Sequence, residues 1–264
     1  MESYLASMGI GDNGKTTEAQ AAAVTTIANA PNSTIIKFNE LRYFTSITES
    51  KGGFNSSNTG ACSFYNWTAL QEIDISNFTS LGHSLDYGWN DTFRLCTALK
   101  KVIASNKLTK LGHNAFNGCS NLEEISGLSG TITVYNSAFN NCSKLTSDNF
   151  QNCTFVWANN QPSVFARCTS LTSLPNCSGS ISSWSFQGCT GLTSVDLSNV
   201  TDLGDGVFDG CTGVTEVIIS NLNDFICLRN NRNALPYGTS NRQIDLYVKN
   251  GNTKTKVTDV VFPT

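Results

Sequence analysis

Two glycine-rich patterns near the start of the chain are the residues that most resemble a catalytic motif. The segment Gly9–Thr16 matches the phosphate-loop pattern G-x-x-x-x-G-K-[ST], and Gly9, Gly11 and Gly14 together match G-x-G-x-x-G. A working phosphate loop needs a buried strand before it, a helix after it and an acidic Mg²⁺-binding strand elsewhere. Only the short polar segment MESYLASM precedes Gly9. We therefore expect a turn that leads into a helix, and no nucleotide cofactor.

The two histidines, His83 and His113, are the next candidates for chemistry. Both follow Leu-Gly in segments that align with each other, so they would lie about one strand spacing apart. Two imidazoles at that separation can share a metal ion with a carboxylate. The aligned position further along the chain is Asp205, which indicates an exposed and variable position. We expect no metal site here.

Carboxylate pairs are the remaining possibility for acid–base chemistry. Glu123 and Glu124 lie on the outward side of an expected strand, next to Lys100 and Lys101 of the preceding segment. Opposite charges in that arrangement are typical of cross-strand neighbours. The chain also contains no G-x-S-x-G elbow and no H-E-x-x-H motif. We expect a protein that is not an enzyme.

The elements that position these side chains repeat along the chain. The motif F-x-x-C-[ST]-x-[LV] recurs at Phe93, Phe116, Phe139, Phe165, Phe186 and Phe208, and a degenerate copy at Phe64 has Trp67 in the cysteine position. Each copy runs into an alternating apolar tail that is typical of a short strand with one buried face. We expect the A-F-x-x-C piece to turn the corner as a short helix or 3₁₀ turn. Stacked coils of this kind bury a continuous core.

The spacing also assigns most of the ten cysteines. Six of them occupy the same position in successive coils: Cys96, Cys119, Cys142, Cys168, Cys189 and Cys211. A buried free cysteine behaves as a small apolar side chain, and Trp67 at the same position argues against a ligand role. We expect structural thiols, with disulfides and metal binding as alternatives. Cys62, Cys153, Cys177 and Cys227 lie outside this column.

The F-x-x-C-[ST]-x-L motif with its upstream [IL]-G-x-x-A-F resembles the bacterial-surface-antigen (BspA-like) leucine-rich repeats of gut-bacterial and bacteriophage proteins. The resemblance covers roughly Ile35 to Ser220. The segments Phe38–Thr48 and Leu246–Pro263 are similar to a leading segment and a closing hairpin that often flank such repeats. It implies a non-enzymatic surface for adhesion or recognition. The irregular spacing and the extra FQNC at Phe150–Cys153 predict distorted middle coils.

The predicted fold class is therefore an α/β repeat solenoid of leucine-rich-repeat coils with short parallel strands. We expect an N-terminal cap over residues 1–34, about seven coils over 35–220 and a C-terminal cap over 221–264. A capping box at Thr17 and Gln20 predicts a helix near Thr17–Ala30. Asn250 and Gly251 predict the turn of a β-hairpin. Caps are expected because end coils otherwise expose core and strand edges.

Composition excludes several classes of partner. Only 14% of the 264 residues are charged, the net charge is −3, and no basic cluster exceeds two neighbours. That supply of cations is too small for a nucleic-acid groove. No apolar run is long enough to cross a bilayer, and the first residues do not form a secretory signal. We expect a location on a virion surface or outside the cell.

Five aromatic residues are the candidate ligand-binding residues: Tyr87, Trp89, Tyr135, Trp157 and Trp184. They lie just upstream of the repeat phenylalanines, where small or polar residues are usual. Aromatic side chains on a polar surface give flat apolar area with a polar handle, which suits a glycan or a protein contact. The alternative is that these rings fill gaps in distorted coils.

Three functions remain open at this stage. The first is a phage virion fibre or decoration protein that contacts a glycan or protein of the host surface. The second is a bacterial cell-surface adhesin or a fragment of one. The third is a structural spacer docked through its caps to other virion or assembly proteins, with the C-terminal VVFPT as a candidate apolar contact. All three need no cofactor, nucleic acid or membrane insertion.

Overall fold

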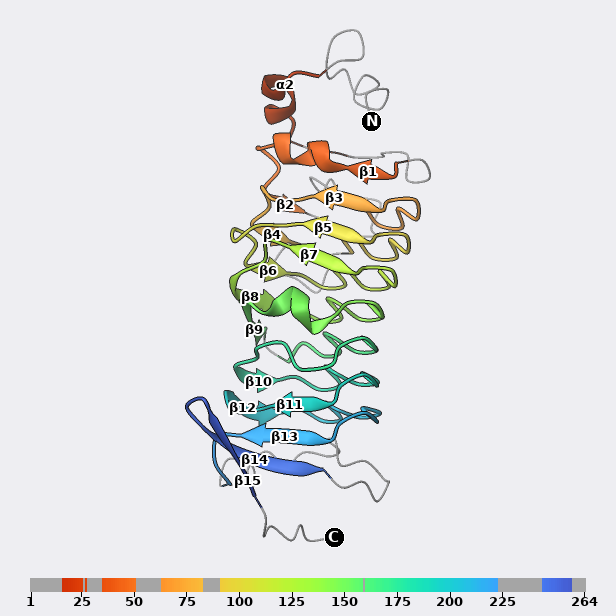
Figure 1. Cartoon of the computed structure of the whole chain (residues 1–264). Helices are drawn as coiled ribbons and strands as arrows, with labels where there is room; N and C mark the ends of the chain where they lie inside the picture. The colour runs from red at the N-terminus through yellow and green to blue at the C-terminus, as the bar shows by residue number, and fades with distance from the viewer. Residues whose placement is uncertain are drawn as a thin grey trace.

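The computed structural model describes residues 16–25, 27, 35–50, 63–82, 91–158, 160–222 and 244–257. They form a solenoid of coils stacked along one axis, with the first described helix and the last described strands at opposite ends of the stack (Figure 1). Most strands are short and parallel to their neighbours, which confirms the predicted repeat architecture. The division into caps and repeats at residues 34 and 220 stays a prediction.

Two parallel sheets run along the first half of the stack. The first contains β1 (Lys37–Phe38), β3 (Glu72–Asp74), β5 (Lys101–Ile103) and β7 (Glu124–Ser126) in that order. The second contains β2 (Glu49–Ser50), β4 (Ser80–Leu81), β6 (Lys110–Leu111), β8 (Gly130–Val134) and β9 (Cys153–Trp157). Each of the first four coils thus contributes one strand to each sheet, the coil of β9 contributes only to the second, and the buried apolar side chains form one continuous core.

Both sheets resume further along the stack. One sheet pairs β10 (Gly179–Ile181) with β12 (Val200–Leu203). The other pairs β11 (Ser194–Asp196), β13 (Glu216–Ile219), β14 (Asp245–Asn250) and β15 (Thr253–Lys256) in that order. Among the described strands only β15 is antiparallel to its neighbour, because β14 and β15 form a hairpin. Its turn residues are Gly251 and Asn252, one residue later than predicted, because Asn250 still pairs with Thr253 in the ladder.

Among the described residues, the short helix α2 (Glu18–Ala22) precedes the first strand, and the 3₁₀ helices η1 (Asn39–Tyr43) and η2 (Ser147–Phe150) lie between strands. The expected capping box begins α2, with Gln20 N–H bonded to Thr17 Oγ1 at 3.2 Å. The helix ends at Ala22, well short of the expected Ala30. The next residues include β-branched Val24 and Thr25, whose side chains lose rotamer freedom in a helix.

The repeat phenylalanines form one column through the core. Successive rings from Phe64 to Phe208 lie 5.0–5.7 Å apart, centroid to centroid, with their planes within 15° of parallel. The six aligned cysteines lie beside this column, buried and free. Each thiol donates to the carbonyl of the phenylalanine one coil back, as Cys119 Sγ does to Phe93 O at 3.0 Å. The prediction of structural thiols is therefore confirmed for these six.

The corners between the sheets are turns, and the expected short helices do not form there. In most coils, the residues two before and two after the repeat phenylalanine have positive φ, which ends any helical run. Asn114, Ser137, Ser163, Trp184 and Gly206 occupy the first of these positions. The backbone then bonds to the next coil, as Phe116 N–H does to Ala138 O at 2.7 Å. Backbone hydrogen bonds between successive coils therefore continue through the corners, in addition to those within the sheets.

Candidate surface recognition site

Charged side chains on the first sheet pair across neighbouring strands. Lys37 Nζ lies 2.8 Å from Glu72 Oε2, and Lys101 Nζ lies 2.9 Å from Glu124 Oε1, directly across β5 and β7. Glu123 pairs with Lys144 at 3.0 Å. Hydrogen bonds from Lys37 and from Asn39 hold the pKa of Glu72 below its ordinary value. The expectation that these charges offset one another across strands is confirmed for Glu124 and Lys101, whereas Glu123 pairs with Lys144 of the following coil and not with Lys100.

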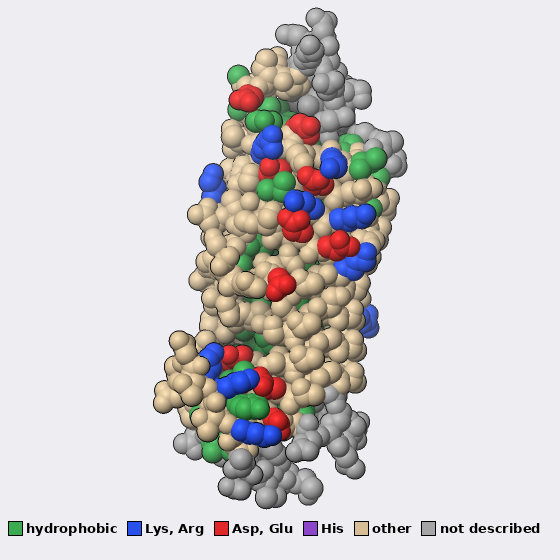
Figure 2. Space-filling view, in the orientation of Figure 1, with side chains coloured by type: hydrophobic (Ala, Val, Ile, Leu, Met, Phe, Trp, Pro, Cys, Tyr) green, Lys and Arg blue, Asp and Glu red, His purple; other side chains and the backbone are tan. Residues whose placement is uncertain are grey.

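A second charged group lies at the far end of the stack. Lys249, Lys254 and Lys256 pair with Asp196, Glu216 and Asp245, each at 2.7 Å. Figure 2 shows the two groups at opposite ends of one face, separated by a band that is largely uncharged. Each acid of these two groups has its own lysine, so the groups offer little net charge to a ligand.

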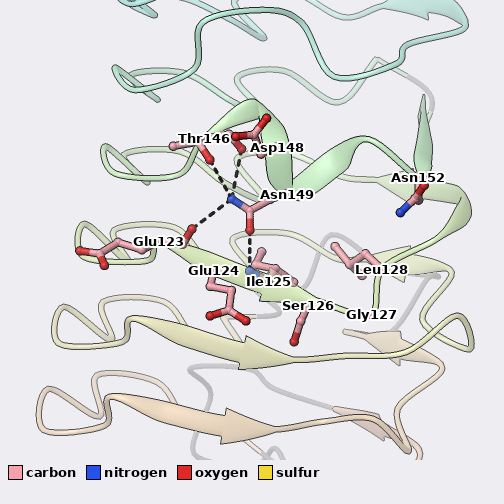
Figure 3. Close-up of a pocket in the computed structure, with 10 residues that line it drawn as sticks. All are labelled: Glu123, Glu124, Ile125, Ser126, Gly127, Leu128, Thr146, Asp148, Asn149 and Asn152. Atoms are coloured by element: carbon pink, nitrogen blue, oxygen red, sulfur yellow. Dashed lines mark hydrogen bonds between the residues drawn. The ribbon is translucent and has the colours of Figure 1, made fainter.

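Between these groups, η2 takes the place of a strand in the first sheet. The extra residues at Phe150–Cys153 displace the backbone here, as the irregular spacing predicted. The Asn149 side chain replaces the missing strand partner: its Oδ1 accepts the Ile125 N–H at 2.7 Å, and its Nδ2 donates to Glu123 O at 3.0 Å (Figure 3). One amide therefore caps the edge of β7.

A shallow depression of about 390 Å³ remains beside η2, lined by residues of β7 and η2 that include Glu123, Glu124, Asp148 and Asn152 (Figure 3). Two of its carboxylates are already paired with lysines. Within the described ranges, no group of three or more His, Cys, Asp and Glu side chains could hold a metal ion. The depression is a consequence of the missing strand and offers no evident chemistry.

The structure separates the predicted ligand-binding aromatics. Trp157 is 8% exposed, because it ends β9 with its ring against Phe186, and its Nε1 donates to Ser185 Oγ at 2.9 Å. It therefore fills the core and cannot contact a ligand at the surface. Tyr135 is half-buried beside His113, whose ring lies 5.5 Å away. Tyr87 and Trp89 lie outside the described residues.

Trp184 is the predicted aromatic that the structure places at the surface. Its side chain is 45% exposed, one of three large apolar residues so exposed in the described part of the chain. Its φ is +54°, a value rarely adopted by a bulky residue. Residues with a strained backbone conformation cluster at functional sites. The equivalent residues with positive φ in other coils are Asn114, Ser137, Ser163 and Gly206, so this coil has an exposed indole where the others have a favourable turn residue.

Other residues singled out by the sequence have ordinary roles or lie outside the described part. Burial raises the pKa of the Cys96, Cys168 and Cys211 thiols to about 12, so they are poor nucleophiles. Burial also lowers the pKa of His113. Several predicted residues lie outside the described part of the chain: residues 9–15 of the glycine-rich segment, Cys62, His83, Cys227 and the VVFPT segment.

Sequence reasoning missed two features of this surface. The first is the role of Asn149, which depends on the backbone geometry around η2, and no sequence motif indicates that geometry. The second is Gly206, which holds the position of Trp184 in the next coil. The aligned repeat copies show this glycine in the sequence, and it lies directly beneath the indole. No helix within the described ranges has both the length and the apolar character needed to span a bilayer.

The sequence matches a known family of repeat proteins. The family model described as "BspA type Leucine rich repeat region" matches in six copies, over residues 20–146, 57–173 and 89–215. No curated protein matched the sequence.

Three solved structures are similar in fold. A leucine-rich-repeat protein of T. pallidum is 24% identical, with 56% of this chain and 62% of that chain covered and a TM-score of 0.36. One from Bacteroides ovatus is 16% identical, with coverage of 74% and 66% and a TM-score of 0.33. A leucine-rich cell surface protein of Faecalibacterium prausnitzii is 15% identical, with coverage of 76% and 94% and a TM-score of 0.22. The chain spans less than two thirds of the first two.

Proposed function

The chain belongs to the BspA-type leucine-rich-repeat family, and from this premise we propose that it is a non-enzymatic recognition protein whose surface contact is centred on Trp184. The observation that carries the proposal is the exposed indole, held at a left-handed backbone position that costs stability. Aromatic rings rank among the side chains that contribute most to binding. The partner we propose is a cell-surface glycan or protein.

We propose that the protein is carried by a phage particle as a fibre or decoration component, with the surface of a bacterium as the alternative carrier. Support for either comes from the resemblance of the repeats to gut-bacterial and bacteriophage proteins. Antibody labelling of purified particles and of intact bacterial cells separates the two. Label on particles supports the virion proposal, and label confined to the cells overturns it.

The recognition proposal is tested by binding of labelled protein to a panel of intact bacterial and animal cells. The informative variant is Trp184→Asn, because asparagine tolerates the left-handed backbone and Asn114 already occupies the same position of another coil. Ile36→Ala is the matched control, since it removes another exposed apolar side chain far along the chain. Saturable binding that Trp184→Asn abolishes and Ile36→Ala preserves is the expected result. Binding unchanged in both variants overturns the choice of Trp184.

A structural spacer is the second candidate, and the two ends of the stack favour it. We propose that α2 and the β14–β15 hairpin cap the coils. The Ser46 hydroxyl bonds to Ala22 O at the end of α2, and every side chain of β15 is exposed threonine or lysine, which discourages further strand pairing. Failure to bind any cell, together with sedimentation as a defined oligomer, would favour the spacer over recognition.

A further inference from the structure

We infer that the corner at Trp184 binds an arginine side chain presented by a partner protein. This inference rests on the proposed recognition function and names the chemistry of its ligand. It begins from the carboxylates that lie near the indole. Eight described carboxylates pair with a lysine or arginine within 4 Å: Glu72, Asp74, Asp91, Glu123, Glu124, Asp196, Glu216 and Asp245.

Two exposed carboxylates beside Trp184 have no such partner. Asp205 and Asp209 belong to the coil that follows Trp184, and neither forms an ion pair in the described part of the chain. The carbonyl of Asp205 accepts the Trp184 N–H at 2.9 Å, which fixes the two residues side by side. Asp209 Oδ2 accepts from Gln187 Nε2 at 3.3 Å, so this carboxylate is held but not neutralised.

Gly206 brings the indole and one carboxylate to the same place. A Cβ atom built on Gly206 would lie 2.7 Å from Trp184 Cδ1, 2.8 Å from Trp184 Nε1 and 3.8 Å from Asp209 Cβ. The five-membered edge of the indole and the Asp209 side chain thus meet over one glycine. The indole is 45% exposed, and two exposed carboxylates without an ion pair belong to the coil that packs against it.

The chemistry of this arrangement selects a planar cation with N–H donors. A guanidinium group stacks on an aromatic face and binds a carboxylate with two parallel N–H donors, so one arginine satisfies both features. A quaternary ammonium group has no N–H to give to Asp205 or Asp209. A sugar ring could stack on the indole, but it gains little from two uncompensated negative charges. The combination therefore favours arginine.

The chain's own Arg167 does not fill this role. It lies one coil earlier at the corner position after the repeat phenylalanine, and its Cγ packs over Gly188, 3.4 Å from where a Cβ of that glycine would lie. No ion pair links Arg167 to Asp205 or Asp209 in the described residues. Within the described residues no arginine fills this role, and we propose that a partner protein supplies it.

The test is a titration followed at the indole N–H signals of protein labelled with ¹⁵N at its four tryptophans. The Trp184 signal is assigned by its loss in Trp184→Asn. The probe is the peptide acetyl-Gly-Arg-Gly-amide, with citrulline, the uncharged isostere, in place of arginine as its control. Choline and a methyl hexoside are the two further arms.

We expect the Trp184 signal to move saturably with the arginine peptide and not with the citrulline peptide. Asp205→Asn/Asp209→Asn should weaken binding by about tenfold or more, because two charge-assisted hydrogen bonds are lost. Asp148→Asn is the matched control: it removes an exposed carboxylate that also accepts from a glutamine, Gln151, in another coil, and should leave binding unchanged. An equal response to citrulline or choline, a response to the hexoside alone, or full binding by the double variant overturns the inference.

The two proposals fail separately. If Trp184→Asn abolishes cell binding while the arginine peptide produces no shift, recognition through Trp184 stands and the arginine assignment is wrong. If the peptide binds at Trp184 but no cell is bound, the site exists and its partner lies within an assembly.

Discussion

The indole of Trp184 rests on Gly206, the residue that holds the same corner position one coil later, with Trp184 Cδ1 2.7 Å from where a Cβ of that glycine would lie. The relationship recurs at the second corner position. Leu95, at φ +62°, reaches over Gly118, and Arg167, at φ +60°, reaches over Gly188. At Trp184 and Leu95 the side chain takes the space that a Cβ of the next coil's glycine would need, whereas Arg167 Cγ lies at an ordinary contact distance of 3.4 Å from that position.

Gly206→Ala should therefore destabilise the protein more than an ordinary glycine substitution at positive φ. Gly130→Ala is the matched control, because Gly130 has φ +79° and nothing within 4 Å of its Cβ position, whereas Gly206 has φ +59° and the indole at 2.7 Å. We expect a loss of about 1 kcal/mol at Gly130 from the backbone alone, and about 2–3 kcal/mol at Gly206. Urea denaturation measures both.

The control for this prediction removes the indole. In a Trp184→Asn background, Gly206→Ala should cost no more than Gly130→Ala. Equal losses for the two alanine variants in the parent protein would show that the indole moves away freely, and would contradict the packing described above.

Asn149→Ala should destabilise the middle coils by about 1–3 kcal/mol, because the Ile125 N–H and the Glu123 carbonyl both lose a partner. Asn152→Ala is the matched control, since Asn152 lines the same depression and its exposed side chain forms no hydrogen bond in the described residues. Amide hydrogen exchange at Ile125 should quicken in the first variant only. Unchanged exchange at Ile125 would mean that β7 does not depend on the asparagine.

The repeat core could be predicted from the sequence because it depends on identities that recur. Phe, Cys and Leu at fixed offsets specify which atoms are buried in every coil, and the column from Phe64 to Phe208 follows directly. The surface could not be predicted in the same way. Trp157 and Trp184 both precede a repeat phenylalanine, but Trp157 ends a strand and points inward, while Trp184 occupies a left-handed corner and points outward. Distinguishing them requires the backbone angles.

Stability should fall at alkaline pH through the buried thiols. Burial raises the pKa of Cys168 from 9.0 to about 12, so the folded protein keeps this proton while the unfolded chain releases it. The stabilisation is fully present below pH 9 and is lost as the pH rises toward 12, by about 1.4 kcal/mol per pH unit for each such thiol. Urea denaturation at pH 8, 9.5 and 10.5 should show this decline.

A Cys168→Ala variant isolates one thiol from the other groups that titrate in this range. It should be less stable than the parent at pH 8, because a cavity remains and the bond to Phe139 O is lost. Its stability should also fall less steeply with pH, by the contribution of one thiol. A slope identical to that of the parent would mean that Cys168 ionises normally in the folded protein.

The charge pairs on the first sheet should contribute little. Lys101 and Glu124 are 38% and 49% exposed in their side chains, so water and salt screen their attraction. We expect Glu124→Gln to change the free energy of unfolding by less than about 0.5 kcal/mol, with no difference from the parent at 1 M salt. Thermal unfolding at low and high salt checks this. A loss above 1 kcal/mol would show that the pair organises β5 and β7.

The pairing of large corner residues with glycines also restricts how such a chain can be rearranged. The coil that carries Trp184 at its left-handed corner is followed by a coil with glycine at the matching position. A copy with Asn or Ser in place of Gly206 would bring a Cβ atom to 2.7 Å from Trp184 Cδ1. An exposed tryptophan gained at such a corner is therefore inherited together with the glycine that accommodates it.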